Sequence, residues 1–145
     1  MILKKRAAGF SLIELMLVLA IMGIIAGIAI PAFLTQRRRA RVIGDAQANA
    51  QVLRMQMETY KADSGVYGTA GNTYTWSWTS STPTAGGSAA AALNFLPKGN
   101  SRMNYSVAIG SGGLLYTIKV MDPTLGASYV VYTVNQNGSA TITPY

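Results

Sequence analysis

The stretch from Lys4 to Leu34, KKRAAGFSLIELMLVLAIMGIIAGIAIPAFL, decides the fold of this chain. From Phe10 to Leu34 it runs for 25 residues with a single ionisable side chain, that of Glu14. As an α-helix this run would extend roughly 37 Å, because each residue adds about 1.5 Å, and the hydrocarbon core of a bilayer is about 30 Å thick. The sequence therefore predicts a helix that can cross a membrane, with a carboxylate near one end.

The residues before the apolar run differ from an ordinary secretory signal. Such a signal has an apolar core of about 7 to 15 residues, followed by a small-residue cleavage site. Here the small residues Ala7-Ala8-Gly9 come before the apolar run and directly after the basic residues Lys4, Lys5 and Arg6. Cleavage at this point would remove a short basic leader, residues 1–9, and leave the apolar helix attached to the mature chain.

Glu14 needs a partner, because a charged side chain inside a membrane costs several kcal/mol, roughly 2.5 to 3.5 for Asp at a helix centre. No Lys or Arg lies between positions 7 and 36. A cut after Gly9 would create an amine at Phe10, one helical turn from Glu14, where the helix N-terminus also favours an anion. This pair could form within one chain or between neighbouring chains. The alternative is a plain single-span anchor whose carboxylate stays hydrated among the headgroups.

This combination of features resembles the amino-terminal signature of the type IV pilin superfamily, which includes pilins and the pseudopilins of type II secretion systems. The matching elements are the basic leader ending in Gly9, then Phe10, Glu14, the apolar run and Pro31. The resemblance implies that a membrane-embedded prepilin peptidase cuts between Gly9 and Phe10 and methylates the new Phe10 amine. It also implies that Glu14 guides docking into a filament by pairing with the Phe10 amine of an adjacent subunit.

The resemblance further implies the partners and the location of the chain. The partners would be other copies in a helical filament, the prepilin peptidase, an inner-membrane assembly platform, and the membrane before assembly. The location would be the bacterial inner membrane first and then an extracellular pilus, with a periplasmic pseudopilus as the alternative. Three basic residues precede the span and four follow it, Arg37, Arg38, Arg39 and Arg41, so charge gives no clear orientation. We follow the resemblance, with the leader inside and the remaining domain outside.

Gly23, Gly27 and Pro31 lie four residues apart on one ridge of the predicted helix. Small residues let helix backbones approach closely, while a proline removes one N–H donor and clashes with the carbonyl four residues earlier. We therefore predict a kink or local unwinding around Gly27 to Pro31, which would let the helix rearrange as a subunit leaves the lipid. Mere tolerance of glycine and proline within a membrane span is the alternative.

An amphipathic helix is predicted after the arginine cluster, because apolar residues recur there at spacings of three and four. These apolar residues are Ile43, Ala46, Ala50, Leu53, Met57 and Tyr60. The polar residues Asp45, Gln47, Asn49, Gln51, Arg54, Glu58 and Lys61 occupy other faces. No proline separates this segment from the span, so we expect one nearly continuous helix from about Ser11 to Asp63, with Gly65 as its stop.

The remaining residues alternate between apolar and polar, which is typical of half-buried strands. The candidate strands are YTWSWT (74–79), MNYSVAI (103–109), LLYTIKVM (114–121), YVVYTV (129–134) and SATIT (139–143). Asn137-Gly138 is a hairpin signal, and GSGG at 110–113 joins the preceding pair. We predict an antiparallel meander of three or four strands packed on the stripe from Ile43 to Tyr60, and a short helix that begins at Ser88 and ends before Pro97.

The predicted fold class is therefore α+β, a long N-terminal helix whose second half packs on a small antiparallel sheet, as in the pilin fold. The predicted organisation is a leader at 1–9, a membrane or filament-core helix at 10–34, its amphipathic continuation at 35–63, and a β domain at 64–145.

Composition argues against an enzyme. The chain has no cysteine and no histidine, and only five acidic residues, so thiol and imidazole chemistry, Cys/His metal sites and paired carboxylates are excluded or hard to build. We predict no catalytic, cofactor or metal site. Nucleic acid is disfavoured as a partner, since Lys98, Arg102 and Lys119 are too sparse for a clustered basic footprint. Trp76 and Trp78 either cap the small core or stack on a sugar or base.

The favoured function is that of a structural pilus subunit, and the alternative is a pseudopilin of a type II secretion system. The segment METYKADSGVYG (57–68) resembles the end of the long helix in many major pseudopilins. The carboxyl-terminal region has few acidic residues, however, and so lacks the acidic calcium-binding loop that the resemblance leads one to expect of a major pseudopilin. This difference favours the pilin.

Overall fold

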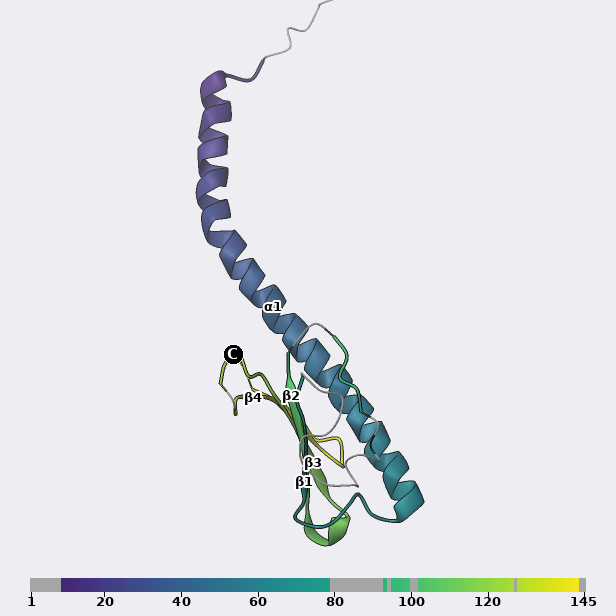
Figure 1. Ribbon diagram of the computed structural model, residues 1–145. Coiled ribbons are helices and arrows are strands. Elements are labelled where there is room, and N and C mark those ends of the chain that lie inside the picture. The colour runs from purple at the N-terminus through teal and green to yellow at the C-terminus, as the bar shows by residue number, and fades with distance from the viewer. Residues whose placement is uncertain (1–8, 79–92, 94, 100–101, 127, 144–145) are drawn as a thin grey trace, which may run out of the picture. The chain divides into compact units, whose positions relative to one another are not determined.

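A computed structural model of the 145-residue chain describes residues 9–78, 93, 95–99, 102–126 and 128–143. These residues form one long helix and one antiparallel sheet, an α+β fold (Figure 1). The chain divides into two compact units, residues 1–38 and 39–145. Two predicted features lie outside the described residues: the start of the short helix at Ser88, and residues 1–8 of the leader.

Helix α1 spans Leu12–Ser64 and ends at a glycine. Gly65 has a φ of +81°, a left-handed conformation that only glycine adopts without strain, and its N–H donates to the Lys61 carbonyl at 2.7 Å. Observed and predicted helix ends differ by one residue on each side. The predicted stop at Gly65 is confirmed.

The helix continues through Pro31 without interruption. The Thr35 hydroxyl donates to the Pro31 carbonyl at 3.0 Å, a local bond that serine and threonine often make in helices. The backbone around Gly27 to Pro31 thus stays helical, so the local unwinding proposed from the sequence is absent here. The kink stays a prediction.

The sheet is an antiparallel meander of five strands in sequence order. The strands are β1 (Thr73–Trp76), β2 (Asn104–Ile109), β3 (Tyr116–Met121), β4 (Val130–Asn135) and β5 (Ala140–Ile142). The prediction of three or four strands was too low. The three residues of β5 are all exposed, so they show no alternation between buried and exposed positions. The strand is defined by its pairing with β4, in which Thr141 lies opposite Thr133.

Two tight connections carry the turn chemistry expected from the sequence. The 3₁₀ turn η1 (Ser111–Gly113) joins β2 to β3, with Gly112 at a φ of +65°. Between β4 and β5 the Asn135 side chain accepts hydrogen bonds from the N–H groups of Asn137 and Ser139 at 3.1 and 3.0 Å. Gly138 in this turn has a φ of +81°, which explains the glycine after Asn137.

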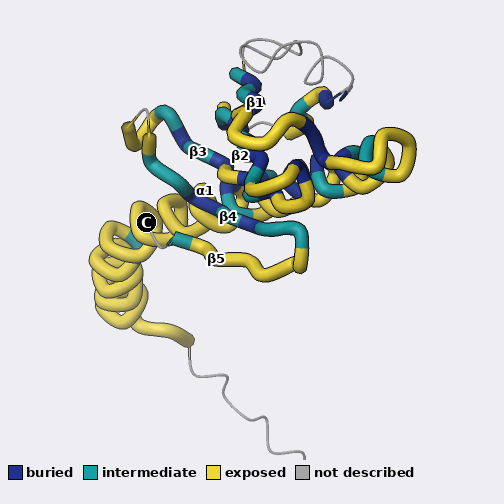
Figure 2. Tube along the Cα trace, turned by 90° about the horizontal axis from the view of Figure 1, so that it is seen from below, coloured by how far each residue is buried: buried dark blue, intermediate teal, exposed yellow. Residues whose placement is uncertain are grey.

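The core lies between one face of the sheet and residues 39–64 of α1, as the dark blue segments of Figure 2 show. The helix contributes the buried residues Val42, Ala46, Asn49, Ala50, Leu53 and Met57. Ile43 and Tyr60, which were predicted to lie on the buried stripe, pack at its margin and are only partly buried. Asn49, assigned from its polarity to another face, is in fact buried, and the hydrogen bonds described below explain why.

Candidate assembly site

The apolar run from Phe10 to Leu34 is exposed along its whole length in the isolated chain. Its large hydrophobic side chains are between 40% and 82% accessible, and the lowest value is that of Val18. By length and hydropathy, α1 is able to cross a membrane. An exposed apolar surface this extensive needs lipid or other helices around it, because monomeric soluble proteins rarely expose contiguous apolar patches of more than a few hundred Å².

Glu14 lies in the first turn of α1, and its carboxylate caps the helix. The Ser11 N–H donates to Glu14 Oε2 at 3.0 Å. Ser11 and Glu14 stand at the spacing of a capping box, in which a residue three positions into the helix reaches back to the N-cap amide. Glu14 therefore has one partner even in the uncut chain, and the expectation that its partner exists only after processing was incomplete.

Gly9, Phe10 and Glu14, the residues predicted for processing and assembly, lie together at the start of the helix. Gly9 and Phe10 are exposed and precede α1, and a Cβ at Gly9 would meet no atom within 4 Å. Cleavage after Gly9 would place an amine on Phe10, one residue from the amide that already contacts Glu14. The local geometry thus brings the predicted bond for cleavage and the predicted assembly carboxylate within one helical turn.

Gly23 and Gly27 have no packing role among the residues that the structure describes. A Cβ at either position would meet nothing within 4 Å, apart from the helix backbone nearby. Glycine costs about 1 kcal/mol relative to alanine inside a helix. Contacts among the described residues therefore do not require these glycines, and both explanations remain, close approach of a neighbouring helix and mere tolerance within the span. Pro31 follows on the same ridge and stays within α1.

A carboxylate and two phenols join the far end of α1 to the sheet. The Tyr67 hydroxyl donates to Glu58 at 2.9 Å, and the Tyr116 hydroxyl donates to Glu58 Oε1 at 3.2 Å. The two rings pack edge to face with centroids 4.6 Å apart. Burial, with the nearby Glu58 charge adding to it, raises the pKa of Tyr67, and burial raises that of Tyr116 to about 12. Both phenols therefore stay neutral donors at physiological pH.

Asn49 fixes a loop of the domain to the helix. Its amide nitrogen donates to the Lys98 carbonyl at 2.7 Å and to the Tyr105 hydroxyl at 2.8 Å, while its oxygen accepts from the Lys98 N–H at 2.9 Å. Three of the four hydrogen bonds that an asparagine side chain offers are thus used in a buried place. Nothing in the sequence pattern distinguishes this asparagine from a solvated one.

The two tryptophans have different surroundings. Trp76 on β1 is 1% exposed and packs edge to face on Phe95, so it belongs to the core. Trp78 lies beyond the end of β1 and is 43% exposed, with the Arg102 guanidinium 4.6 Å above its ring. Of the two roles considered for the tryptophans, Trp76 therefore has the core role, whereas Trp78 lies outside the core because the strand ends before it.

Sequence reasoning missed three polar residues with structural roles, namely Ser11, Asn49 and Glu58 as a tyrosine acceptor. Only the first had a readable signal, the S-x-x-E spacing before an apolar run. Among the described residues, no group of three His, Cys, Asp or Glu side chains is placed to hold a metal ion. The Asp122 carboxylate accepts from the N–H and hydroxyl of Thr124 at 2.8 and 2.6 Å.

Comparison with known families locates the resemblance at the amino terminus. Residues 4–30 match the family model described as the prokaryotic N-terminal methylation motif. No solved structure matches the chain significantly. The matched segment contains Gly9, Phe10 and Glu14 and most of the exposed apolar run, the features that the geometry brings together. The chain therefore carries the amino-terminal signature of type IV pilins and pseudopilins on a long apolar helix.

Proposed function

We propose that this chain is the structural subunit of a type IV pilus and has no catalytic activity of its own. Prepilin peptidase cuts it between Gly9 and Phe10 and methylates the Phe10 amine, and the processed chains polymerise through α1. One observation carries the proposal: the methylation motif covers residues 4–30, and within it the stretch from Phe10 to Ile30 is an exposed apolar run with Glu14 as its one charged side chain.

Assembly follows from the cost of exposed apolar surface and of unpaired charge. Before assembly, lipid covers the run from Phe10 to Leu34 in the inner membrane. In the filament, the helices of other copies replace the lipid, and Gly23 and Gly27 allow close approach of their backbones. A register that left Glu14 or the Phe10 amine buried without a partner would cost several kcal/mol, whereas pairing them across subunits removes that cost.

A pseudopilin of a type II secretion system is the second candidate. The resemblance of residues 57–68 to the helix end of major pseudopilins favours it. Against it stands the acid content of residues 64–145, which contain one acidic residue, Asp122, whose carboxylate is engaged with Thr124. An acidic calcium-binding loop cannot be built from that single side chain. The pilus subunit is the better supported of the two.

Intact mass and amino-terminal sequencing test the proposal. The protein is recovered from the sheared surface fraction of its native bacterium and, separately, from the membranes. A chain that starts at methylated Phe10 in sheared filaments is the expected result. The same processed chain confined to the membranes would indicate the pseudopilin instead. An uncut chain that still carries residues 1–9, in cells that process other such proteins, would overturn both readings.

A further inference from the structure

The strand register places five polar residues in one line across the sheet. Directly opposed pairs on neighbouring strands link Thr75 to Ser106, Ser106 to Lys119, Lys119 to Thr133, and Thr133 to Thr141. Opposed residues of antiparallel strands point to the same side. Their neighbours along the strands, such as Tyr105, Ile118 and Val134, are buried in the core against α1. The line therefore lies on the opposite side, which we call the outer face.

A second line runs parallel to the first. It is formed by Thr73, Ala108, Thr117 and Asn135, which are again opposed pair by pair. All the residues of both lines are exposed or half-buried. Neighbouring strands lie about 4.8 Å apart, so the outer face offers hydroxyl and amide groups at a repeat close to the length of one sugar unit in an extended polysaccharide.

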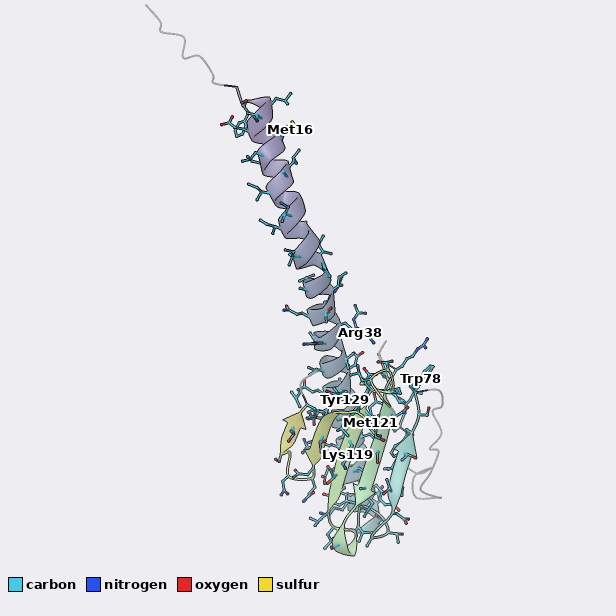
Figure 3. The ribbon with its side chains drawn as sticks, turned by 90° about the vertical axis from the view of Figure 1, so that its left-hand side faces the viewer. Met16, Arg38, Trp78, Lys119, Met121 and Tyr129 are labelled. Carbon is cyan, nitrogen blue, oxygen red and sulfur yellow. The ribbon has the colours of Figure 1, made fainter. Side chains whose placement is uncertain are left out.

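The charge of this part of the chain is positive. Residues 64–145 contain three basic residues, Lys98, Arg102 and Lys119, and a single acidic residue, Asp122. The acidic residue is 3% exposed and holds Thr124, so it presents almost no surface to a ligand. Lys119, by contrast, is exposed at the centre of the first line of hydroxyls, as Figure 3 illustrates. The positive charge on this face attracts an anionic partner, and residues 64–145 present no exposed acidic side chain that would repel it.

An exposed aromatic ring stands at the edge of the same face. Trp78 follows β1, its backbone N–H donates to the Asn104 side-chain oxygen at 3.4 Å, and Arg102 covers one side of its ring. Asn104 is the first residue of β2 and lies opposite Met121. It precedes Ser106 by two residues, so it is on the same side of the sheet, the outer face. An indole that is 43% exposed and backed by a guanidinium can receive the apolar side of a sugar ring.

We infer that the outer face binds an acidic polysaccharide. Lys119 and Arg102 pair with its carboxylates, the serine and threonine hydroxyls bond to its hydroxyl groups, and Trp78 packs on a sugar ring. A nucleic acid fits less well, because three basic side chains and one exposed indole fall short of a continuous phosphate track with several stacking rings. The inference goes beyond filament assembly and does not depend on it, since it concerns the sheet alone.

The inference is tested with alginate oligosaccharides, which are polyuronates. Their binding to the full-length chain is measured in micelles of an uncharged detergent. Wild-type protein is expected to bind alginate and not neutral dextran, and the binding is expected to weaken as salt rises. Lys119→Ala and Arg102→Ala should each weaken binding by about fivefold, the size of an exposed ion pair. Lys98→Ala is the matched control, because it removes the same charge from an exposed position outside the outer face and should leave affinity within twofold.

A second set of variants tests the uncharged contacts. Trp78→Ala and Thr133→Val should each weaken alginate binding severalfold without changing the thermal unfolding temperature, and Thr133→Val keeps a β-branched side chain on the strand. The inference fails if wild-type protein does not bind alginate, or if the Lys98 and Lys119 variants lose affinity equally. It also fails if single-stranded oligothymidylate binds more tightly than alginate, which would make the face a nucleic-acid site.

Discussion

Glu14 has an observed role as a helix cap and a proposed role in assembly, and one substitution can separate the two. In the uncut chain its carboxylate accepts a hydrogen bond from the Ser11 amide, which caps the helix, while its negative charge is available to an amine on Phe10. A glutamine at this position keeps the acceptor oxygen and loses the charge. The cap depends on the hydrogen bond, whereas the proposed pairing with the Phe10 amine would depend on the charge, so the two can be tested apart.

Glu14→Gln is expected to be processed and inserted normally but to form few filaments. Glu14→Ala should lose filaments as well and should also weaken the start of the helix by about 1 kcal/mol, because its cap is gone. Sheared filament yield, together with amino-terminal sequencing of the membrane fraction, measures both effects. Abundant filaments from the glutamine variant would show that the charge does not set the register.

Gly9→Val is expected to block removal of residues 1–9. Gly9 is exposed and a Cβ there meets no atom within 4 Å, so the substitution leaves the rest of the chain undisturbed and acts on the peptidase alone. The measurement is intact mass from membranes of cells that produce the peptidase. Phe10-initiated protein at wild-type levels would contradict the predicted cleavage position.

At the scale of the element, α1 is one helix with two kinds of surface. The large hydrophobic side chains from Leu12 to Leu34 are exposed, whereas the stretch from Val42 to Met57 buries a stripe against the sheet. The exposed part has no contacts in the chain to explain its glycines, and the buried part depends on polar bonds from Asn49 and Glu58 as well as on packing. Substitutions in the two parts should therefore affect different measurements.

Asn49→Ala should destabilise the domain by about 2 to 3 kcal/mol, because it leaves the buried Tyr105 hydroxyl and the Lys98 backbone amide without their partner. Urea unfolding followed by circular dichroism, in an uncharged detergent, provides the measurement. Gln47→Ala, a neighbouring exposed position on the same helix, should change stability by less than about 0.5 kcal/mol. Equal losses of stability in the two variants would show that the hydrogen bonds of Asn49 do not stabilise the domain.

Gly27→Leu should leave the isolated subunit folded and inserted but reduce filament yield, because it adds bulk where helices of neighbouring copies approach. Since a Cβ at Gly27 meets nothing within 4 Å in the chain, the substitution should not lower the thermal unfolding temperature. Ala29→Leu adds bulk at an exposed position on another side of the helix and serves as the comparison. If Gly27→Leu filaments are as abundant as wild type, the glycine pair has no packing role.

At the scale of the whole molecule, the helix and most strands were predictable because their apolar residues repeat with a clear period. The segment of strand β5 was among the candidates because it follows the Asn137-Gly138 turn, but its three exposed residues give no apolar repeat, and the predicted number of strands was too low. Burial of Asn49 and exposure of Trp78 also escaped prediction, since each depends on contacts between segments far apart in the sequence. The residues proposed for processing and assembly were found from local sequence, whereas the outer face emerged only from the strand register.

The domain should lose stability in alkaline solution. Burial raises the pKa of Tyr67, Tyr74, Tyr105 and Tyr116 above the ordinary value near 10, and that of Tyr116 to about 12. The folded state therefore favours the neutral phenols, and the stabilisation is complete below pH 10 and declines as the pH rises through 12. Tyrosinate absorbance and circular dichroism should change together above pH 10. Full ionisation of the tyrosines with an intact dichroism spectrum would contradict this coupling.

The contrast between the two tryptophans gives the protein two intrinsic fluorescent reporters. Because Trp76 is 1% exposed and Trp78 is 43% exposed, collisional quenchers in solution should reach the second indole far more readily than the first. Iodide should quench Trp78 the more strongly because Arg102 attracts the anion to its ring. The emission that resists quenching comes from Trp76 and reports on the folding of the core. The emission that is quenched comes from Trp78 and reports on binding at the outer face, so no attached label is needed.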